Sequence, residues 1–420
     1  MAERPVVAVV RCEDYEEARV EEALRRALEL LGGLSQYIRP GQRVALKPNL
    51  LRPRPPEAAV STHPSVVRAV VRLVQECGAT PVIAESPGGP FTTAALRYVY
   101  QKSGLAQVAA ETGAELNYDT SVTRVPNPEG GLLRLIDVIS AVAHADAVIN
   151  LPKLKTHNLT RLTAATKNLF GVIPGVTKIG YHAKLQNALD FSRGLVDIGR
   201  CVRPVLSILD GVVAMDGNGP SGGDPFAGRV LVASPDMLAE DVVAMALVGW
   251  EPLSNPVIKA AAEWGLTTGR LEDIELRGDP LESLRFQGFR PGSATVMDPG
   301  LVPVPRGLLR LVLPLIRARR AGGQPAAGEP AADELDVGTV PGPFRAWATR
   351  QLVVTPSAGE RCTGCGSCAK QCPVGAIRMV DGRARMDAAR CIRCYCCHEL
   401  CPQLAVELRR PWLGRLLFGE

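Results

Sequence analysis

Residues 43–85 read RVALKPNLLRPRPPEAAVSTHPSVVRAVVRLVQECGATPVIAE, and they contain one complete strand, helix and strand unit. The apolar run at 43–47 predicts a strand, the periodic run at 63–78 predicts a helix that ends at Gly78, and 81–85 predicts a second strand. Two strands joined through a helix pair in parallel, with the helix packed on one face of the sheet. This stretch therefore predicts an α/β fold.

The same alternation continues on both sides of this unit. Further strands are expected at 6–11, 145–151, 205–210 and 229–234, and further helices at 16–31, 92–112, 184–202 and 236–249. Strands that are apolar along their whole length are buried on both faces. We therefore expect an open, largely parallel sheet covered by helices on both sides.

Length and composition exclude several classes of protein. The chain has 420 residues, which at roughly 150 residues per domain predicts two to three domains. Its 46% hydrophobic and 22% charged residues are typical of folded proteins and exclude whole-chain disorder or coiled coil. No apolar run is long enough to predict a transmembrane segment, and acidic residues near the start exclude a signal peptide, so we expect a cytoplasmic protein. The net charge of +5 is too small to predict nucleic-acid binding.

Nine of the 12 cysteines lie between Cys362 and Cys401. Eight of them form the pattern Cys-x2-Cys-x2-Cys-x3-Cys-Pro twice, with the second copy starting at Cys391. Clustered cysteines in a reducing compartment indicate metal ligands, and this pattern is that of bacterial ferredoxins with two 4Fe-4S clusters. Zinc ribbons need only two Cys-x2-Cys pairs, which makes zinc the weaker interpretation.

In such ferredoxins the last cysteine of each run ligates the cluster of the other run. The first cluster is therefore expected on Cys362, Cys365, Cys368 and Cys401, and the second on Cys372, Cys391, Cys394 and Cys397. The ninth cysteine, Cys396, fits neither spacing, and we expect a buried residue that is not a ligand.

Domain boundaries follow from composition. We expect an α/β domain over 1–290, a peripheral helix and a Pro- and Gly-rich linker over 291–345, and a small α+β ferredoxin domain over 346–420. The helix is expected at 306–321 and the linker at 321–343. The chain from Arg345 onward carries twelve basic and six acidic side chains, which indicates a surface for an acidic electron carrier, such as a ferredoxin or a flavodoxin.

Lysine is rare in this chain, yet it gathers in one window. Only nine of the 48 basic residues are lysines, and five of these nine lie between Lys153 and Lys184. A solvated basic face would accept arginine, so this window indicates a site that needs a compact ammonium for anion binding or proton transfer. The expected catalytic residues are Lys155, His157 and Lys167.

The expected substrate-binding residues follow predicted strands, where open α/β sheets bind ligands. They are Lys47, Asn49, Lys153, Thr156, Asn168, Lys178, His182, Asp216 and Asn218. Lys153, Lys155, Thr156 and His157 are expected in a loop directly after the strand at 145–151. Residues 211–225 are either an ordinary glycine turn or a ligand loop carrying Asp216 and Asn218, and the pattern leaves both open. Motifs of P-loop ATPases, zincins and α/β-hydrolases are absent from the sequence.

Four motifs together resemble a widespread prokaryotic family, the domain of unknown function 362. They are KPNLL (47–51), THPSVVRAVVRLVQECGA (62–79), NLPKLKTHNLTRLTAATKNLFGVIPG (150–175) and LDGVVAMDGNGPSGGDP (209–225). Members of that family often carry a C-terminal two-cluster ferredoxin module. The resemblance implies an iron–sulfur protein and implies no substrate.

Taken together, these features predict an iron–sulfur protein with two 4Fe-4S clusters. It would pass single electrons to or from an α/β domain that binds a small anionic substrate, as a ferredoxin-linked reductase. The alternative is a non-catalytic electron-transfer or assembly subunit that docks a redox partner. The sequence leaves open whether the protein is itself an oxidoreductase.

Overall fold

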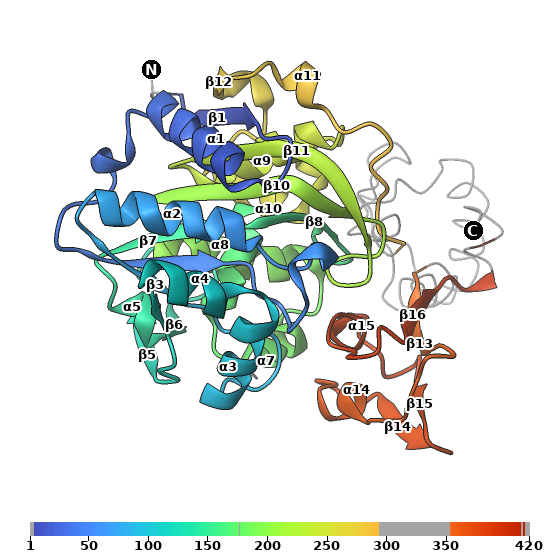
Figure 1. The fold of residues 1–420 in the computed structure, drawn as a ribbon. Coiled ribbons are helices and arrows are strands. Elements are labelled where there is room, and N and C mark those ends of the chain that lie inside the picture. The colour runs from blue at the N-terminus through green and yellow to red at the C-terminus, as the bar shows by residue number, and fades with distance from the viewer. Residues whose placement is uncertain (1–3, 176, 294–352, 413–414, 416–420) are drawn as a thin grey trace, which may run out of the picture.

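The computed structural model describes residues 4–175, 177–293, 353–412 and 415. The helix expected at 306–321 and the linker expected at 321–343 lie outside these residues. The described chain forms a large N-terminal part, and a smaller C-terminal part lies beside it (Figure 1).

A ten-stranded sheet lies at the centre of the described N-terminal part. Its main path runs in the order β12-β1-β11-β10-β7-β2-β3-β4, with β8 paired to β10 and β9 paired to β8. The strands are β1 (Val6–Arg11), β2 (Arg43–Pro48), β3 (Thr80–Ile83), β4 (Glu115–Leu116), β7 (Ala147–Leu151), β8 (Lys153–His157), β9 (Arg161–Thr163), β10 (Leu206–Asp216), β11 (Asp224–Ser234) and β12 (Glu275–Gly278).

Most neighbouring strands of this sheet run parallel, as the sequence predicts. Strand β7 pairs in parallel with β2 and β10, and β2, β3 and β4 continue in the same direction. The exceptions are β11, which is antiparallel to both β1 and β10, and β9, which is antiparallel to β8. Strands β10 and β11 are longer than expected, because both extend into residues 211–228 and form one long hairpin.

Helices cover both faces of the sheet (Figure 1). Helices α1 and α2 pack on one face through Val20, Leu24, Val66 and Val70, and α8, α9 and α10 contribute to the buried clusters on the other face. The helices are α1 (Glu17–Leu30), α2 (Pro64–Glu76), α3 (Thr93–Lys102), α4 (Leu105–Thr112), α5 (Ser140–Ala143), α6 (Ala165–Asn168), α7 (Thr177–Lys184), α8 (Ala188–Val202), α9 (Met237–Leu247), α10 (Pro256–Glu263) and α11 (Leu281–Leu284). The fold class predicted from the sequence is confirmed.

The prediction of a loop directly after the strand at 145–151 is wrong. Pro152 ends β7, and the chain continues as β8, in which all five residues are buried. Strand β8 pairs with β10 in parallel, with Lys153 opposite Asp210 and Lys155 opposite Met215. The sequence pattern suggested an exposed rim because it contains two lysines, but buried partners satisfy both ammonium groups. A two-stranded hairpin of β5 (Val122–Pro126) and β6 (Leu135–Ile139) was also not expected.

The C-terminal part is a small α+β unit. It contains two antiparallel pairs, β13 (Thr355–Ala358) with β16 (Val406–Arg409) and β14 (Ile377–Val380) with β15 (Arg383–Met386). Each cysteine run contains one short helix, α14 (Ser367–Lys370) or α15 (Cys396–Glu399), which carries the third cysteine of the run. Helix α15 faces the N-terminal part, whereas β14 and β15 lie on the far side (Figure 1).

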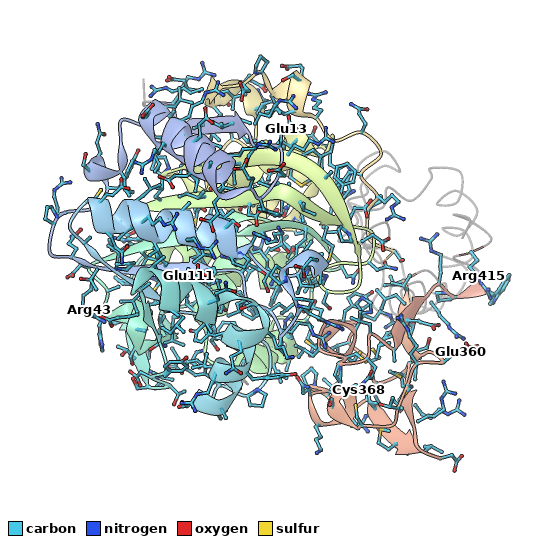
Figure 2. The ribbon with its side chains drawn as sticks, viewed as in Figure 1. Glu13, Arg43, Glu111, Glu360, Cys368 and Arg415 are labelled. Atoms are coloured by element: carbon cyan, nitrogen blue, oxygen red, sulfur yellow. The ribbon has the colours of Figure 1, made fainter. Side chains whose placement is uncertain are left out.

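Figure 2 shows Cys368 in the small C-terminal part, Arg43 at the outer edge of the large part and Glu111 on the side of the large part that faces the viewer. Arg43 pairs there with Glu115, and Glu111 pairs with Arg68. None of the helices within the described residues has the length and apolar character needed to cross a membrane.

Candidate functional site

Two cavities in the C-terminal part are each bordered by four cysteines. The first cavity is lined by Cys362, Cys365, Cys368 and Cys401. The second cavity is lined by Cys372, Cys391, Cys394 and Cys397. These are the two crossed sets that the spacing predicts, and cysteine thiolates are the ligands that iron–sulfur clusters require. The donor sets therefore fit 4Fe-4S clusters, and Cys396 borders neither cavity.

Backbone amides support the cysteine sulfurs. Cys372 Sγ accepts a hydrogen bond from Ala376 N at 3.2 Å, and Cys401 Sγ accepts one from Ala405 N, also at 3.2 Å. The same contact thus occurs at the same place in both runs. N–H donors to ligand sulfurs favour the more negative, reduced state of a cluster and raise its potential.

The backbone between the cysteines also repeats. Gly364 and Gly366 have φ values of 71° and 73°, and the equivalent residues of the second run, Arg393 and Tyr395, have φ values of 56° and 59°. Glycine adopts this left-handed conformation freely, whereas other residues are strained in it. The buried Tyr395 ring compensates, because its hydroxyl donates to the Val354 carbonyl at 3.2 Å.

Helix α15 contacts the N-terminal part through Glu399. The Glu399 carbonyl accepts hydrogen bonds from Ser221 Oγ at 2.9 Å and from Arg52 Nη1 at 3.1 Å. Its carboxylate Oε1 lies 3.2 Å from His157 Nε2. The neighbouring His398 Nε2 lies 3.3 Å from the Asn218 carbonyl. The helix that begins one residue before the ligand Cys397 is thus attached to the α/β part by side-chain contacts.

His157 acts in this contact as a neutral ring. Its Nδ1 accepts hydrogen bonds from the backbone amides of Leu159 and Thr160 at 3.1 and 3.2 Å, so the ring proton lies on Nε2, the nitrogen that lies 3.2 Å from Glu399 Oε1. Burial lowers the pKa of His157. Burial alone would raise the pKa of Glu399, but the contact with His157 and the nearby Lys167 ammonium lower it below its ordinary value.

A third cavity, of about 80 Å³, lies where α15 meets the ends of β2 and β3. We call it the lysine cavity. Its polar lining from the N-terminal part includes Lys47, Asn49, Glu85, Lys167, Asn168, Lys178 and His182. Its lining from the C-terminal part is Cys396, Glu399 and Leu400.

Lys47 and Glu85 form a buried ion pair in this cavity. Lys47 is on β2 and Glu85 follows the adjacent parallel strand β3, so the strand ends bring Nζ and Oε2 to 2.5 Å. Burial lowers the pKa of Lys47 and raises that of Glu85, while their mutual attraction opposes both shifts. Gly171 makes room for the pair, because a Cβ there would lie 2.5 Å from Lys47 Nζ and even closer to Glu85.

Lys178, on α7, lies beside this pair. Its ammonium donates to the carbonyls of Ser86 and Pro87. Burial lowers the pKa of Lys178 to about 7, against the attraction of Glu85. This lysine therefore exchanges its proton near neutral pH, as a proton donor in catalysis must.

Lys167 and His182 also line the cavity. Among the described residues, the Lys167 ammonium makes no hydrogen bond or ion pair, and its contacts are the rings of Phe170 and Phe191, at 5.0 and 5.9 Å from their centroids. His182 stacks on Phe191 at 4.4 Å, and its buried Nδ1 has no hydrogen-bond partner among the residues that the structure describes. Burial lowers the pKa of His182 to about 4, so the ring is neutral at pH 7.

Lys155 lies behind the cavity wall. Its ammonium donates to Asn49 Oδ1 at 2.9 Å and to the Val60 carbonyl at 2.6 Å. Asn49 Nδ2 in turn donates to Asn168 Oδ1 at 3.0 Å, and Asn168 donates to Asn150 Oδ1 at 2.8 Å. This chain fixes the two amides that line the cavity.

The other expected site residues lie apart from the lysine cavity. Lys153 donates to Asp210 at 2.8 Å and to the Tyr15 hydroxyl at 2.6 Å, and so ties β8 to β10. Three of the expected residues hold the turn between β10 and β11. Thr156 bonds to Gly217 and Gly219, Asp216 accepts from Arg290, and Asn218 accepts from Ser293. In the described residues this turn contacts α15 through Asn218 and Ser221 and does not line the cavity.

Sequence reasoning did not select Glu85, Arg52, Ser221 or Glu399. Glu85 could have been selected, because it is the last residue of an otherwise apolar predicted strand. Glu399 carries a subtler signal, since the equivalent residue of the first cysteine run is Lys370. This reversal of charge between the two runs distinguishes the helix that contacts the α/β part.

Comparison with known proteins gives the class. The family model of a domain of unknown function (DUF362) matches residues 44–246, and that of a 4Fe-4S dicluster domain matches residues 357–402. The chain belongs to the DUF362 family and carries a ferredoxin-type domain that binds 4Fe-4S.

Two curated proteins are similar to the chain. It is 38% identical over 262 residues to the thylakoid-associated protein sll1697 of Synechocystis sp., covering 62% of this chain and 79% of that protein. It is 48% identical over 48 residues to one component of the ion-translocating oxidoreductase complex of Methanosarcina acetivorans, covering 11% of this chain and 18% of that component.

Solved structures match only distantly. The lactate racemase apoprotein of Thermoanaerobacterium thermosaccharolyticum gives a TM-score of 0.36 at 12% identity, covering 56% of this chain and 54% of that one. A Thermotoga maritima protein gives a TM-score of 0.30 at 14% identity, covering 49% of this chain and 52% of that one. The chain thus spans about half the length of these structures.

Proposed function

We propose that this protein is a ferredoxin-linked reductase for a small anionic substrate that binds in the lysine cavity. Two 4Fe-4S clusters would be held by the crossed cysteine sets that border the two cysteine cavities. When bound, such clusters supply electrons one at a time at low potential. The iron–sulfur domain supports an electron-transfer role. Substrate binding and proton donation would belong to residues of the α/β part.

One observation carries this proposal. Cys396, Glu399 and Leu400 line the same cavity as Lys47, Lys167 and Lys178. Cys396 lies between Cys394 and Cys397 in the chain, and Leu400 directly precedes Cys401, so residues adjacent to ligands of both cysteine sets border this cavity. A substrate bound there would lie next to the iron–sulfur domain.

The cavity residues divide the work of a reduction. Lys167 has an ammonium without a polar partner among the described residues, so it would bind the anionic group of the substrate. Lys178 would donate a proton, because reduction consumes protons as well as electrons. Lys155 would orient the substrate indirectly, through Asn49 and Asn168. His157 would hold Glu399, and with it α15, against the cavity.

An acidic ferredoxin or flavodoxin would deliver the electrons at the far side of the C-terminal part. Three exposed basic residues lie there on β14 and β15, namely Arg378, Arg383 and Arg385. The exposed side chain of Met379, on β14, borders the cavity of the first cysteine set. Complementary charge would accelerate the encounter of the two proteins. We place the protein in the cytoplasm, where reducing conditions favour cysteine ligands over disulfides.

The experiment uses the full chain, loaded with iron and sulfide without oxygen and then reduced. Mass spectrometry of the small molecules that co-purify supplies the first candidates. Each candidate is mixed with the reduced protein, in which the cluster absorbance is bleached. The recovery of this absorbance to the level of the oxidised protein is then followed over time. In a reductase, the clusters are reoxidised at a rate that saturates with substrate concentration. This rate should fall in Lys167→Arg and remain unchanged in Lys102→Arg, because Lys102 lies outside the cavity. Stable capture of a second protein, with no small molecule that reoxidises the clusters, would identify the non-catalytic subunit instead.

A further inference from the structure

We infer that the lysine cavity binds a small carboxylate that also carries a hydrogen-bond donor, a hydroxyl or an ammonium, on a carbon near the acid group. This inference rests on the proposed function only in taking the lysine cavity as the substrate site. The molecule that it names is the reduced form of the substrate, which is a hydroxy acid or an amino acid.

The cavity offers one available cation. Lys47 is occupied by Glu85 at 2.5 Å, and Lys178 is occupied by the carbonyls of Ser86 and Pro87. Lys167 has only aromatic rings as partners among the described residues. A carboxylate that enters the cavity would therefore bind at Lys167, where a charge-assisted hydrogen bond forms without breaking an existing one.

The cavity also offers one available anion. Glu399 Oε1 lies 3.2 Å from His157 Nε2, yet this buried oxygen accepts no hydrogen bond from the described residues. Glu399 and Lys167 both line the cavity, yet no ion pair within 4.0 Å joins them. The space between them is therefore bordered by a cation on one side and an acceptor on the other.

This arrangement excludes a plain carboxylic acid as the best ligand. A ligand with one negative charge and no donor would share a small cavity with the buried Glu399 carboxylate, and like charges repel more strongly beside buried groups than in water. A hydroxyl or ammonium on the ligand removes that penalty by donating to Glu399. The orphaned Nδ1 of His182 points to the same conclusion, because a buried polar atom without a partner costs about 1 to 3 kcal/mol until a ligand satisfies it.

Volume limits the size of the ligand. A cavity of about 80 Å³ holds roughly five to eight water-sized positions, at about 10 to 15 Å³ each. This space encloses an acid of a few carbons and is too small to enclose a nucleotide, a flavin or a quinone. The size of the cavity therefore favours a small acid as the ligand.

The same geometry indicates the chemistry. A carbonyl acid that gains two electrons and two protons becomes a hydroxy acid, as the C=O double bond is replaced by C–H and O–H bonds. The electrons come one at a time from the reduced external carrier, one proton comes from Lys178 and the other comes from water. Glu399 accepts hydrogen bonds and cannot donate them when ionised, so it favours the hydroxyl product over the carbonyl substrate.

Binding is measured on the oxidised, cluster-loaded full chain, without a reductant, so that no turnover occurs. The probes share a four-carbon skeleton. They are butyrate, which has the acid alone, hydroxybutyrate and aminobutyrate, with the donor on the second or third carbon, and butanediol, which has donors alone. Thermal unfolding reports binding, because a ligand of the folded state raises the midpoint by mass action. We expect at least one hydroxy or amino acid to bind about tenfold or more tightly than butyrate, as one charged hydrogen bond provides.

Two variants test the assignment of the ends. Lys167→Met should abolish binding of every acid, whereas Glu399→Gln should remove most of the preference for the donor, because the repulsion of butyrate disappears. Lys102→Met is the matched control. Butyrate that binds wild type as tightly as the other acids, or the absence of binding by all four-carbon acids, would overturn the inference, and these outcomes need no variant. If the preference is present but no oxobutyrate is reduced, the inference stands and the proposed reductase fails, so the two failures are distinguishable.

Discussion

His157 on β8 and Glu399 on α15 lie 3.2 Å apart, from Nε2 to Oε1, and this contact joins the α/β part to the iron–sulfur part. Two backbone amides fix the tautomer of the histidine, so that its only ring proton lies on Nε2, the nitrogen that contacts the carboxylate. The contact holds the neighbours of the ligand cysteines against the lysine cavity. The proposed transfer of electrons into that cavity depends on it.

Removal of the His157 ring should loosen α15. His157→Ala removes the imidazole that contacts the buried Glu399 carboxylate, at a cost of about 1 to 3 kcal/mol in the free energy of unfolding. Hydrogen exchange of the backbone amides of His398, Glu399 and Leu400 should become faster. His144→Ala serves as the control, because His144 is exposed and bonds only to Thr123. Equal exchange of α15 in both variants would show that His157 does not hold the helix.

Stability should rise with pH above neutrality, and Lys178 should account for part of the rise. Its pKa of about 7 in the folded chain is well below its ordinary value, because burial disfavours the charge that Glu85 favours and that Lys47 and Lys167 oppose. Between pH 7 and about 10 the unfolded chain therefore binds one more proton than the folded chain, and the free energy of unfolding increases by up to about 1.4 kcal/mol per pH unit. Denaturant titrations at several pH values should show a smaller slope for Lys178→Met. An unchanged slope, like that expected for the exposed-lysine control Lys102→Met, would contradict this assignment.

Gly171 should resist substitution, and Gly180 should not. A Cβ at Gly171 would lie 2.5 Å from Lys47 Nζ, so Gly171→Ala must displace the buried Lys47–Glu85 pair, at a cost of about 1 to 3 kcal/mol. Gly180 lies in α7 and has open space at its Cβ position, so Gly180→Ala should stabilise the protein by about 0.5 to 1 kcal/mol. Denaturant unfolding of both variants tests this. A mild effect at Gly171 would mean that the pair is not packed as described.

The cysteine assignments predict the iron content. The full chain should bind about eight irons and eight sulfides when loaded without oxygen. Cys396→Ala should keep this content, because Cys396 borders the lysine cavity and neither cysteine cavity. Cys397→Ala should lose or degrade one cluster. Iron near four in wild type, zinc in place of iron, or exchanged phenotypes of the two variants would each show that the ligand assignment is wrong.

Local pattern was enough to predict the sheet, its helices and the cysteine spacing. The strand at 43–47, the helix at 63–78 and the strand at 81–85 agree with β2, α2 and β3 to within about two residues. The pattern failed at β8, because the sequence shows lysines and not the buried partners that neutralise them. Lys153 needs Asp210 and Tyr15, from distant strands and loops, to be buried as an ion pair. We therefore expect loss of Lys153 or Lys155 to impair folding. Lysines on an exposed rim could be lost without this effect.

The composition of the candidate site was predictable only in part. Six of the expected residues line the lysine cavity, namely Lys47, Asn49, Lys167, Asn168, Lys178 and His182. They could be selected because they follow strands or belong to the lysine window. Glu399 could not be placed in the same site, because the contact between the two parts is not encoded in any local spacing. The roles of Asp216 and Asn218 likewise depend on Arg290, Ser293 and α15, which the chain brings together only on folding.

The central claim is that electrons from the iron–sulfur domain reach a small acid held at Lys167. The most direct measurement is stopped-flow mixing of the reduced, cluster-loaded chain with oxobutyrate, without oxygen, with the cluster absorbance as the readout. We predict reoxidation that saturates with oxobutyrate in wild type, persists in Lys102→Met and is lost in Lys167→Met. Reoxidation no faster than in buffer, or equally fast in wild type and Lys167→Met, would contradict the account.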